Sequence, residues 1–355
     1  MSTAMYYNPL IRINALVFSM VLSCTSITAA SGNGAQSCVD ATSTIIRNDI
    51  ERSIGIPVSH KDNVDRSKLT EICYERYCTL YNSETKTPEW VVERLTPAIV
   101  SGINTRPKIG FSIDKKLKDI RKAAKKADKL APIVAGKEPM KTADMVTATN
   151  ADYTNSDLAR GHQAPSADYK CSEDWMKQTF KFSNAVPQVQ DGFNGGIWRE
   201  LEDHVNNLAM ERDEIFVITG PVAMDAEGKD TIIEKRMNAC GRRIALAGLS
   251  TLNKSSICDA NNKDSSKTCK YGVSVPSGLF KIIYIPETNR AFGFLMSNED
   301  HRKLKKRDVD NTAYLEEWRT SIQAIEEAAN LKFFTNLSLR SSRVQKQHCT
   351  ETRWR

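Results

Sequence analysis

The sequence contains no apolar run as long as the roughly 18–20 residues that a membrane-spanning helix requires, which excludes a polytopic membrane protein. It also contains no C-x-x-C pair, so a zinc ribbon or a thioredoxin-type redox site has no support, and it shows no internal repeats. Hydrophobic residues nevertheless make up 40% and charged residues 26% of the 355 residues. Such a chain can bury a core, which excludes a disordered or collagen-like protein. The net charge of +7 permits a phosphate-rich partner without requiring one.

The first 30 residues have the layout of a secretory signal peptide. Arg12 precedes the apolar residues 13–22, and small residues follow up to Ala30. We therefore expect a signal peptide over residues 1–30, a secreted or periplasmic protein, and no transmembrane segment in the mature chain. Two alternatives stay open: a buried N-terminal helix, and a lipoprotein anchored at Cys24, although Leu22 fits a lipobox poorly.

The nine cysteines support export to an oxidising compartment. Removal of Cys24 with the signal leaves eight, and an even number in an exported protein indicates disulfides. Cys258 and Cys269 bracket a polar loop that a bridge could close. Cys73 and Cys78 fall on an expected helix, where a spacing of five residues would hold their Cα atoms too far apart for a relaxed bridge.

Before residue 150 the pattern is mostly polar. We expect an irregular polar lead over residues 31–65, a helix followed by extended chain over 66–100, and an inserted linker over 131–147. The lysine-rich residues 113–130 predict an amphipathic helix. Its basic face is either simply solvated or a surface for nucleic acid or an anionic membrane. The basic run at 302–307 is typical of a solvated loop.

The second half has clearer periodicity. Trp198, Leu201, Val205 and Leu208 step by 3, 4 and 3 residues, which predicts a helix, and a second helix is expected over 321–329. Strands are predicted at five places, residues 180–183, 215–219, 273–276, 280–284 and 291–295. These strands cluster without βαβ alternation, so the predicted class is α+β.

Three residues are candidates for chemistry. His162 lies in the turn-like Arg-Gly-His-Gln-Ala-Pro; a histidine there can be structural, but imidazole can also take a proton from water near neutral pH. Asn194 stands just before the predicted helix, either as its N-cap or as an oxygen ligand for a hard cation. Glu202 follows eight residues later, about 80° around the helix axis. It is either an exposed carboxylate or a group that holds metal-bound water.

These segments together resemble the sugar-nonspecific DNA/RNA endonucleases of the endonuclease G type. The family signature is Asp-Arg-Gly-His, then Ser-Asn-x-x-Pro-Gln, then Asn-x-x-x-Trp-x-x-Leu-Glu. This sequence has Ala-Arg-Gly-His at 159–162, Ser-Asn-Ala-Val-Pro-Gln at 183–188, and the third motif with the same spacing at 194–202. Further similar pieces keep the same order over roughly residues 75–336.

The resemblance implies a central antiparallel β-sheet flanked by helices, with a ββα-metal (His-Me) finger as the active site. The endonuclease domain would cover residues 66–340, including the lysine-rich insertion at 113–147, with a C-terminal tail at 341–355. Family members are often dimers, so a homodimer is possible.

The resemblance also implies a mechanism for cleaving DNA and RNA. Asn194 would hold one Mg²⁺, for which Mn²⁺ is a possible substitute, and Glu202 would act on the ion through water. His162 would deprotonate the attacking water, and Arg160 would stabilise developing negative charge. We place further nucleic-acid contacts at Lys115 and Lys122 in the lysine-rich segment.

Two positions depart from the family pattern. Ala159 replaces the leading Asp of the signature, with Asp157 two residues earlier, and Asn206 stands where the family often has an arginine one turn after the helix Glu. Arg106 aligns loosely with another family arginine. The departures motivate an alternative, a weakened or inactive nucleic-acid-binding protein on the same fold. A third possibility is an envelope lipoprotein in which the motifs are incidental.

Overall fold

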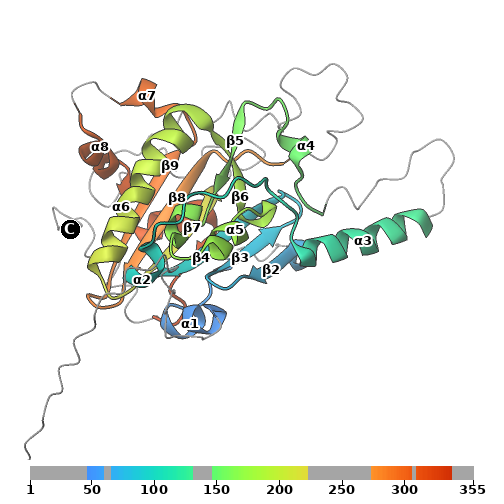
Figure 1. The fold of residues 1–355 in the computed structure, drawn as a ribbon, viewed down its shortest axis with the longest axis horizontal. Helices are drawn as coiled ribbons and strands as arrows, with labels where there is room; N and C mark the ends of the chain where they lie inside the picture. Colours follow the sequence, from blue (N-terminus) through green and yellow to red (C-terminus); the bar gives the residue numbers. More distant parts are fainter. Residues whose placement is uncertain (1–45, 60–64, 131–145, 223–272, 306–308, 338–355) are drawn as a thin grey trace, which may run out of the picture. The chain divides into compact units, whose positions relative to one another are not determined.

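The structure is a computed structural model that describes residues 46–59, 65–130, 146–222, 273–305 and 309–337 (Figure 1). The predicted signal peptide, the Cys24 anchor, the Cys258–Cys269 bridge, the tail and most of the 131–147 linker lie outside these residues. The domain boundaries at 66 and 340 therefore stay a prediction. No helix within the described residues is both long and apolar enough to cross a bilayer.

The central element is a seven-stranded sheet in the order β10-β9-β8-β7-β4-β3-β2, and each neighbouring pair is antiparallel. This confirms the predicted α+β class with a central antiparallel sheet. The strands are β2 (Leu69–Cys73), β3 (Tyr77–Asn82), β4 (Thr87–Leu95), β7 (Ile215–Val222), β8 (Gly278–Ile285), β9 (Arg290–Ser297) and β10 (Arg319–Thr320). Two smaller pairs are β5 (Leu158–His162) with β6 (Ala185–Val189), and β1 (Val58–Ser59) with β11 (Leu331–Lys332).

Helices cover the middle of the sheet. Every residue of β8 is buried, so side chains on both faces of that strand are covered, as happens when a sheet lies inside a layered structure. Figure 1 shows α6 lying across the sheet beside β7, β8 and β9. The described helices are α1 (Ile46–Ser53), α2 (Pro97–Val100), α3 (Lys115–Leu130), α4 (Asn150–Tyr153), α5 (Glu173–Gln178), α6 (Trp198–Glu211), α7 (His301–Leu304), α8 (Asn311–Glu317) and α9 (Ile322–Ala329).

The periodicity of α6 predicted its packing correctly. Trp198, Leu201, Val205 and Leu208 are all buried in the main core, on the face of the helix turned to the sheet. Burial of each such side chain contributes about 1.5–3 kcal/mol. This face holds the helix on the sheet and so fixes the direction in which its remaining side chains point.

Several local predictions of secondary structure were wrong. Residues 180–183 make only an isolated bridge, Ser112 with Lys181, and the chain enters a 3₁₀ turn before β6 begins at Ala185. Residues 273–276 are irregular, and the strand begins at Gly278. Within the expected irregular lead, residues 46–59 form α1 and β1, because Ile46, Ile50 and Ile54 pack into the main core.

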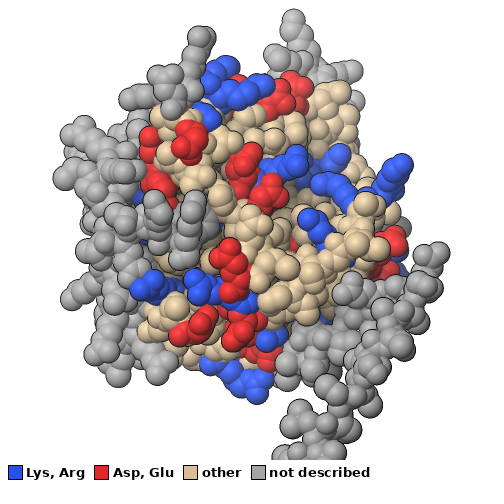
Figure 2. All heavy atoms as spheres, turned by 60° about the vertical axis from the view of Figure 1, so that its left-hand side comes forward, with Lys and Arg blue, Asp and Glu red and all other residues tan. Residues whose placement is uncertain are grey.

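The surface shown in Figure 2 carries both signs of charge. Lysine and arginine side chains are interspersed there with aspartate and glutamate. The mild positive charge of the chain is therefore not concentrated on this face.

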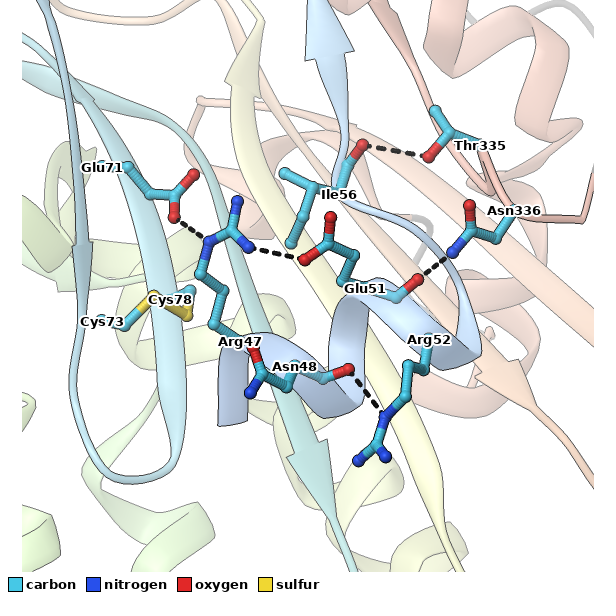
Figure 3. A network of polar contacts seen from close by, with 10 residues as sticks. All are labelled: Arg47, Asn48, Glu51, Arg52, Ile56, Glu71, Cys73, Cys78, Thr335 and Asn336. Carbon is cyan, nitrogen blue, oxygen red and sulfur yellow. Dashed lines mark hydrogen bonds and ion pairs between the residues drawn. A yellow bond between two sulfur atoms is a disulfide. The ribbon is translucent and has the colours of Figure 1, made fainter. Parts of the chain in front are cut away.

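The helix predicted around Cys73 and Cys78 is instead the β2–β3 hairpin. The two cysteines are directly paired across the strands and form a disulfide, with Cα atoms 4.0 Å apart (Figure 3). The prediction failed because a five-residue spacing is too long only along a helix, whereas a hairpin brings both ends of such a segment together.

The same region ties the two ends of the described chain together (Figure 3). Arg47 on α1 donates to Glu71 on β2 at 2.5 Å and to Glu51 at 2.6 Å. Beyond β11, the Asn336 amide donates to the carbonyl of Glu51, and the Thr335 hydroxyl donates to the carbonyl of Ile56 at 3.2 Å. The first helix is therefore held by both the edge of the sheet and the last described residues.

The hairpin disulfide provides a stability test. We expect the Cys73→Ala/Cys78→Ala variant to unfold with a free energy lower by about 2 kcal/mol, because the bridge closes only a short loop in the unfolded chain. Urea unfolding under non-reducing conditions measures this difference. A midpoint equal to that of the wild type would contradict a stabilising bridge.

Candidate active site

The predicted site residues come together on one ββα unit. β5 ends at His162, β6 pairs with it antiparallel, the segment Gln190–Ile197 follows, and α6 completes the unit. This segment contacts β5, β6 and α6, so the loop with Asn194 lies between the strand of His162 and the helix of Glu202. The predicted finger architecture is therefore present.

Gly161 allows β5 and β6 to approach closely. A Cβ atom at this position would lie 1.9 Å from Gln188 Oε1 and 2.7 Å from its Cγ. Gln188 is fully buried, and because its Cγ atom is included, the overlap involves more than the end of a flexible side chain. The Gly of Arg-Gly-His and the Gln of Pro-Gln are thus two halves of one packing contact.

Asn184 fixes the chain just after His162. Its buried side chain accepts from the amide of Ala164 at 2.9 Å and donates to the carbonyls of Ala164 and Thr179, both at 2.9 Å. The amide of Gln163 also donates to the Asn184 carbonyl at 3.0 Å. The Ser-Asn motif therefore acts by holding the turn that carries the histidine.

His162 is a neutral base in an aromatic pocket. Its ring lies 4.8 Å, centroid to centroid, from both Phe111 and Phe180, and only 8% of the residue is exposed. Among the described residues, its Nε2 atom has no hydrogen-bond partner. Burial, aided by the positive charge of Arg106, lowers the pKa of His162 to about 3. The imidazole is thus unprotonated at neutral pH, the form that a general base requires, but burial and Arg106 make it a weaker base than a free histidine.

Two arginines border this pocket. Arg160 lies two residues before His162 on β5, on the same face of the strand, and its guanidinium lies 5.8 Å from the Phe111 ring. Arg106 lies 5.1 Å from the ring of Phe180. Both are exposed, so they can meet an anion beside the histidine. The loose sequence match at Arg106 thus corresponds to a position next to His162.

Asn194 does not cap α6, since the residue before the helix is Ile197. Its amide nitrogen donates to Gln190 Oε1 at 3.1 Å, so its carbonyl oxygen, the atom that a hard cation would take, is not engaged in this bond. Within the Gln190–Ile197 segment, Gly192 has a φ of +78° and lies close to Asp300. A Cβ atom at this position would lie 2.0 Å from Asp300 Oδ1. Arg302 holds Asp300 at 2.8 Å and reaches Asp191 at 3.4 Å.

Within the described residues, no group of three or more His, Cys, Asp or Glu side chains is placed to hold a metal ion. A cation beside Asn194 would therefore have few protein ligands and would keep much of its water. That is the coordination that Mg²⁺ accepts readily.

Glu202 on α6 interacts electrostatically with a buried charged cluster. The cluster is formed by Glu93, Asp168 and Lys281, each of which is only 1% exposed. Tyr169 donates to Glu93 at 2.7 Å, and the Lys281 ammonium donates to Thr219 at 2.8 Å. Burial raises the pKa of Asp168 to about 7 and that of Glu202 to about 8, while the attraction of Lys281 opposes both shifts. Lys281 is thus the cation that three carboxylates on different elements share.

The two departures from the family pattern have different surroundings. Asn206 donates to Asp168 at 3.1 Å, so it belongs to the buried cluster and ties α6 to the chain after His162. Ala159 occupies the face of β5 opposite to Arg160 and His162. Asp157 is exposed and has φ +58°, before the strand begins.

Lys115 and Lys122 are exposed on α3, apart from the ββα unit. Sequence reasoning missed the roles of Phe111 beside His162 and of the Glu93, Asp168 and Lys281 cluster. A signal for the cluster was present, because Lys281 interrupts an otherwise apolar strand.

Comparison with known proteins gives the family of this arrangement. Residues 138–339 match the sequence model of the family described as DNA/RNA non-specific endonuclease. A mitochondrial nuclease of Saccharomyces cerevisiae is 30% identical over 187 residues, covering 50% of this chain and 49% of that protein. A nuclease of Syncephalastrum racemosum is 26% identical over 264 residues, covering 74% of this chain and 66% of that protein. The chain thus spans about half to two-thirds of the length of these two curated relatives.

The fold also has a solved counterpart. It is similar to a chain in a crystal structure of an EndoG/EndoGI complex, with a TM-score of 0.51 and 21% identity, covering 80% of this chain and 91% of that one. The likeness concerns the fold and agrees with the ββα unit described above.

The contact at Gly161 can be tested directly. We expect Gly161→Ala to lower the free energy of unfolding by about 1–3 kcal/mol, because the added methyl group overlaps a buried side chain at more than its flexible end. Thermal or urea unfolding measures it. Gly110→Ala is the control, since a Cβ there meets no atom within 4 Å, and it should change stability by less than about 0.5 kcal/mol. Equal stability of the two variants would contradict the packing role.

The buried cluster predicts a pH dependence of stability. Because the pKa of Asp168 is raised in the folded state to about 7, its contribution is fully present at low pH and is lost as the pH rises through 7. We therefore expect Asp168→Asn, which can still accept from Asn206, to lose less stability than the wild type between pH 5 and pH 8. Urea unfolding across this range tests it, with the exposed Asp213→Asn as the control. Parallel wild-type and Asp168→Asn profiles would show that Asp168 does not titrate in this way.

Proposed function

The chain belongs to the DNA/RNA non-specific endonuclease family, and from this premise we propose that it hydrolyses phosphodiester bonds of DNA and RNA with little preference for sequence or sugar. The observation that carries the proposal is the neutral His162 on the ββα unit, with two exposed arginines bordering its pocket, Arg160 on β5 and Arg106 beside the ring of Phe180. An unprotonated base beside two cations suits attack of water on a phosphodiester.

In this proposal His162 takes the proton from the attacking water. Its place is fixed from three sides, by the Gly161–Gln188 contact, by the Asn184 hydrogen bonds and by the ring of Phe111. Arg160 and Arg106 bind the phosphate oxygens and offset the negative charge that grows on them. When phosphate binds, its charge offsets that of Arg106, which favours protonation of the imidazole as it takes the proton.

The proposed cofactor is Mg²⁺, with Mn²⁺ as a possible substitute. Asn194 would hold the ion through its carbonyl oxygen, and Gln190 orients that amide. Glu202 would hold metal-bound water by hydrogen bonds. When bound, the cation supplies positive charge at the phosphate and the leaving oxygen. The donor set fits, because one amide oxygen and one more distant carboxylate leave most coordination positions to water and substrate.

Contacts to phosphates rather than to base edges would explain the low specificity, because phosphates carry no sequence information. Lys115 and Lys122 are proposed to add such contacts on α3. Export through a signal peptide ending at Ala30, an endonuclease domain over residues 66–340 and a homodimer stay parts of the proposal.

The second candidate function is nucleic-acid binding with weak or no cleavage. Asn206 favours it, because the place of a family arginine is taken by a neutral side chain bound to Asp168. Against it, Lys281 supplies a cation to the same cluster, and Ala159 does not lie on the face of β5 that carries His162.

Plasmid cleavage distinguishes the two. With Mg²⁺ the wild type should nick and linearise plasmid DNA and degrade RNA, and EDTA should stop both reactions. His162→Ala should lower the rate about 10²–10⁴-fold, the usual contribution of a general base. Asn194→Ala should lose activity as well and should recover part of it at higher metal concentration, since it removes a ligand rather than the base.

His204→Ala on α6 serves as the matched control and should keep wild-type activity. Full activity of a folded His162→Ala protein would contradict the role of His162 as general base. Binding of DNA without cleavage under Mg²⁺ and Mn²⁺ would instead favour the second function.

A further inference from the structure

Helix α3 starts from a rigid base at the wall of the candidate site. Ser112, three residues before the helix, donates from its amide to the carbonyl of Phe180 at 3.0 Å, and its carbonyl accepts from the amide of Phe182 at 3.1 Å. Phe111 lies against His162. The chain that enters α3 is therefore part of the pocket around the histidine.

The first turn of α3 is anchored in the protein. The buried Asp114 accepts from the Ser183 hydroxyl at 2.8 Å and from the Tyr74 hydroxyl. Leu117 is fully buried, and the Lys116 ammonium donates to the carbonyl of Glu71 on the edge strand β2 at 2.8 Å. The start of the helix is thus fixed in direction.

The rest of α3 leaves the body of the protein. Figure 1 shows the helix extending past β2, away from the sheet. Residues 122, 123, 125, 126 and 127 are all exposed, and Ile120 is 40% exposed. Most of the described side chains beyond its first turn are therefore available to a partner from solution.

Most of its exposed lysines lie along one stripe, in which Lys115 is also paired with Asp119 at 2.9 Å. At 100° per residue, Lys115, Lys118, Lys122, Lys125 and Lys126 fall within an arc of about 100° and rise about 16 Å along the axis. All five are exposed. The stripe contrasts with the mixed charges on the face in Figure 2. Duplex DNA carries one negative charge per about 1.7 Å of its axis, so a row of cations of this length can meet several phosphates at once.

We propose that α3 is a second phosphodiester-binding surface, which holds the backbone of a long nucleic acid outside the cleavage site. The inference rests on the proposed function for the identity of the ligand. A lipid surface is less suited, because a membrane-binding helix needs large apolar residues opposite its basic face. The exposed part of α3 presents Ile120 and small alanines there, Ala123, Ala124 and Ala127. The surface makes the enzyme prefer long substrates and makes that preference sensitive to salt.

Binding tests the surface without relying on cleavage. The test variant is Lys118→Gln/Lys125→Gln/Lys126→Gln in the full chain carrying His162→Ala. Its affinity for a 40-base-pair duplex should fall at least tenfold, and log K should depend less steeply on log salt, by about 2–3 in slope, because up to three counterion-releasing contacts are lost. The control changes three exposed lysines elsewhere, Lys68, Lys170 and Lys303, to Gln and should bind within about twofold of its parent.

Cleavage separates this inference from the proposed function. With His162 restored, the three-lysine variant should keep its kcat/KM on a tetranucleotide and lose at least tenfold on the 40-base-pair duplex. If the wild type cleaves neither substrate, the proposed function fails, yet the binding comparison still decides on the surface.

Two results would overturn the inference. One is an unchanged affinity and salt slope, or an equal loss in the control variant. The other is that the three-lysine variant loses binding to phosphatidylserine-containing vesicles while its affinity for the duplex is unchanged, which would assign the stripe to a membrane.

Discussion

The rest of the site depends on the electrostatic attraction between the buried ammonium group of Lys281 and the carboxyl groups around it. Lys281 comes from β8 in the centre of the sheet, and it attracts carboxylates from β4, from the turn after β5 and from α6. Removal of this cation would raise the pKa of all three carboxyl groups further, because the charge of Lys281 opposes the effect of burial on each of them. The cluster thus couples the sheet to both limbs of the ββα unit, whereas the apolar stripe of α6 supplies most of the packing energy.

The cluster also connects two parts of the ββα unit, the chain after His162 and the helix that carries Glu202. Asp168 lies six residues after His162, and its partner Asn206 lies one turn after Glu202. This hydrogen bond links the helix of Glu202 to the chain that follows His162. Asn206 itself is neutral, and the positive charge of the cluster comes from Lys281 on the sheet.

The site motifs were readable in the sequence because each is local. His162, Asn194 and Glu202 stand at fixed spacings within short segments, and the 3.6-residue period placed α6 correctly. The hairpin at Cys73 and Cys78 was not readable, because its stability comes from cross-strand pairing and burial rather than from helix propensity. The Lys281 cluster joins residues from 93 to 281, and no local pattern reports such proximity. Only the presence of a lysine inside an apolar strand pointed to a buried partner.

The hydrogen bonds that join Glu51 and Ile56 to the residues after β11 have a consequence for how the chain folds. They join residues 279 and 285 positions apart in the sequence. Closing so long a loop costs conformational entropy that local contacts do not, so pairings of this kind form late and slow the reaction. During synthesis, moreover, α1 emerges early and must wait for almost all of the described chain before its partners exist. The first helix thus acquires its full set of hydrogen bonds only after the chain has been made as far as Asn336.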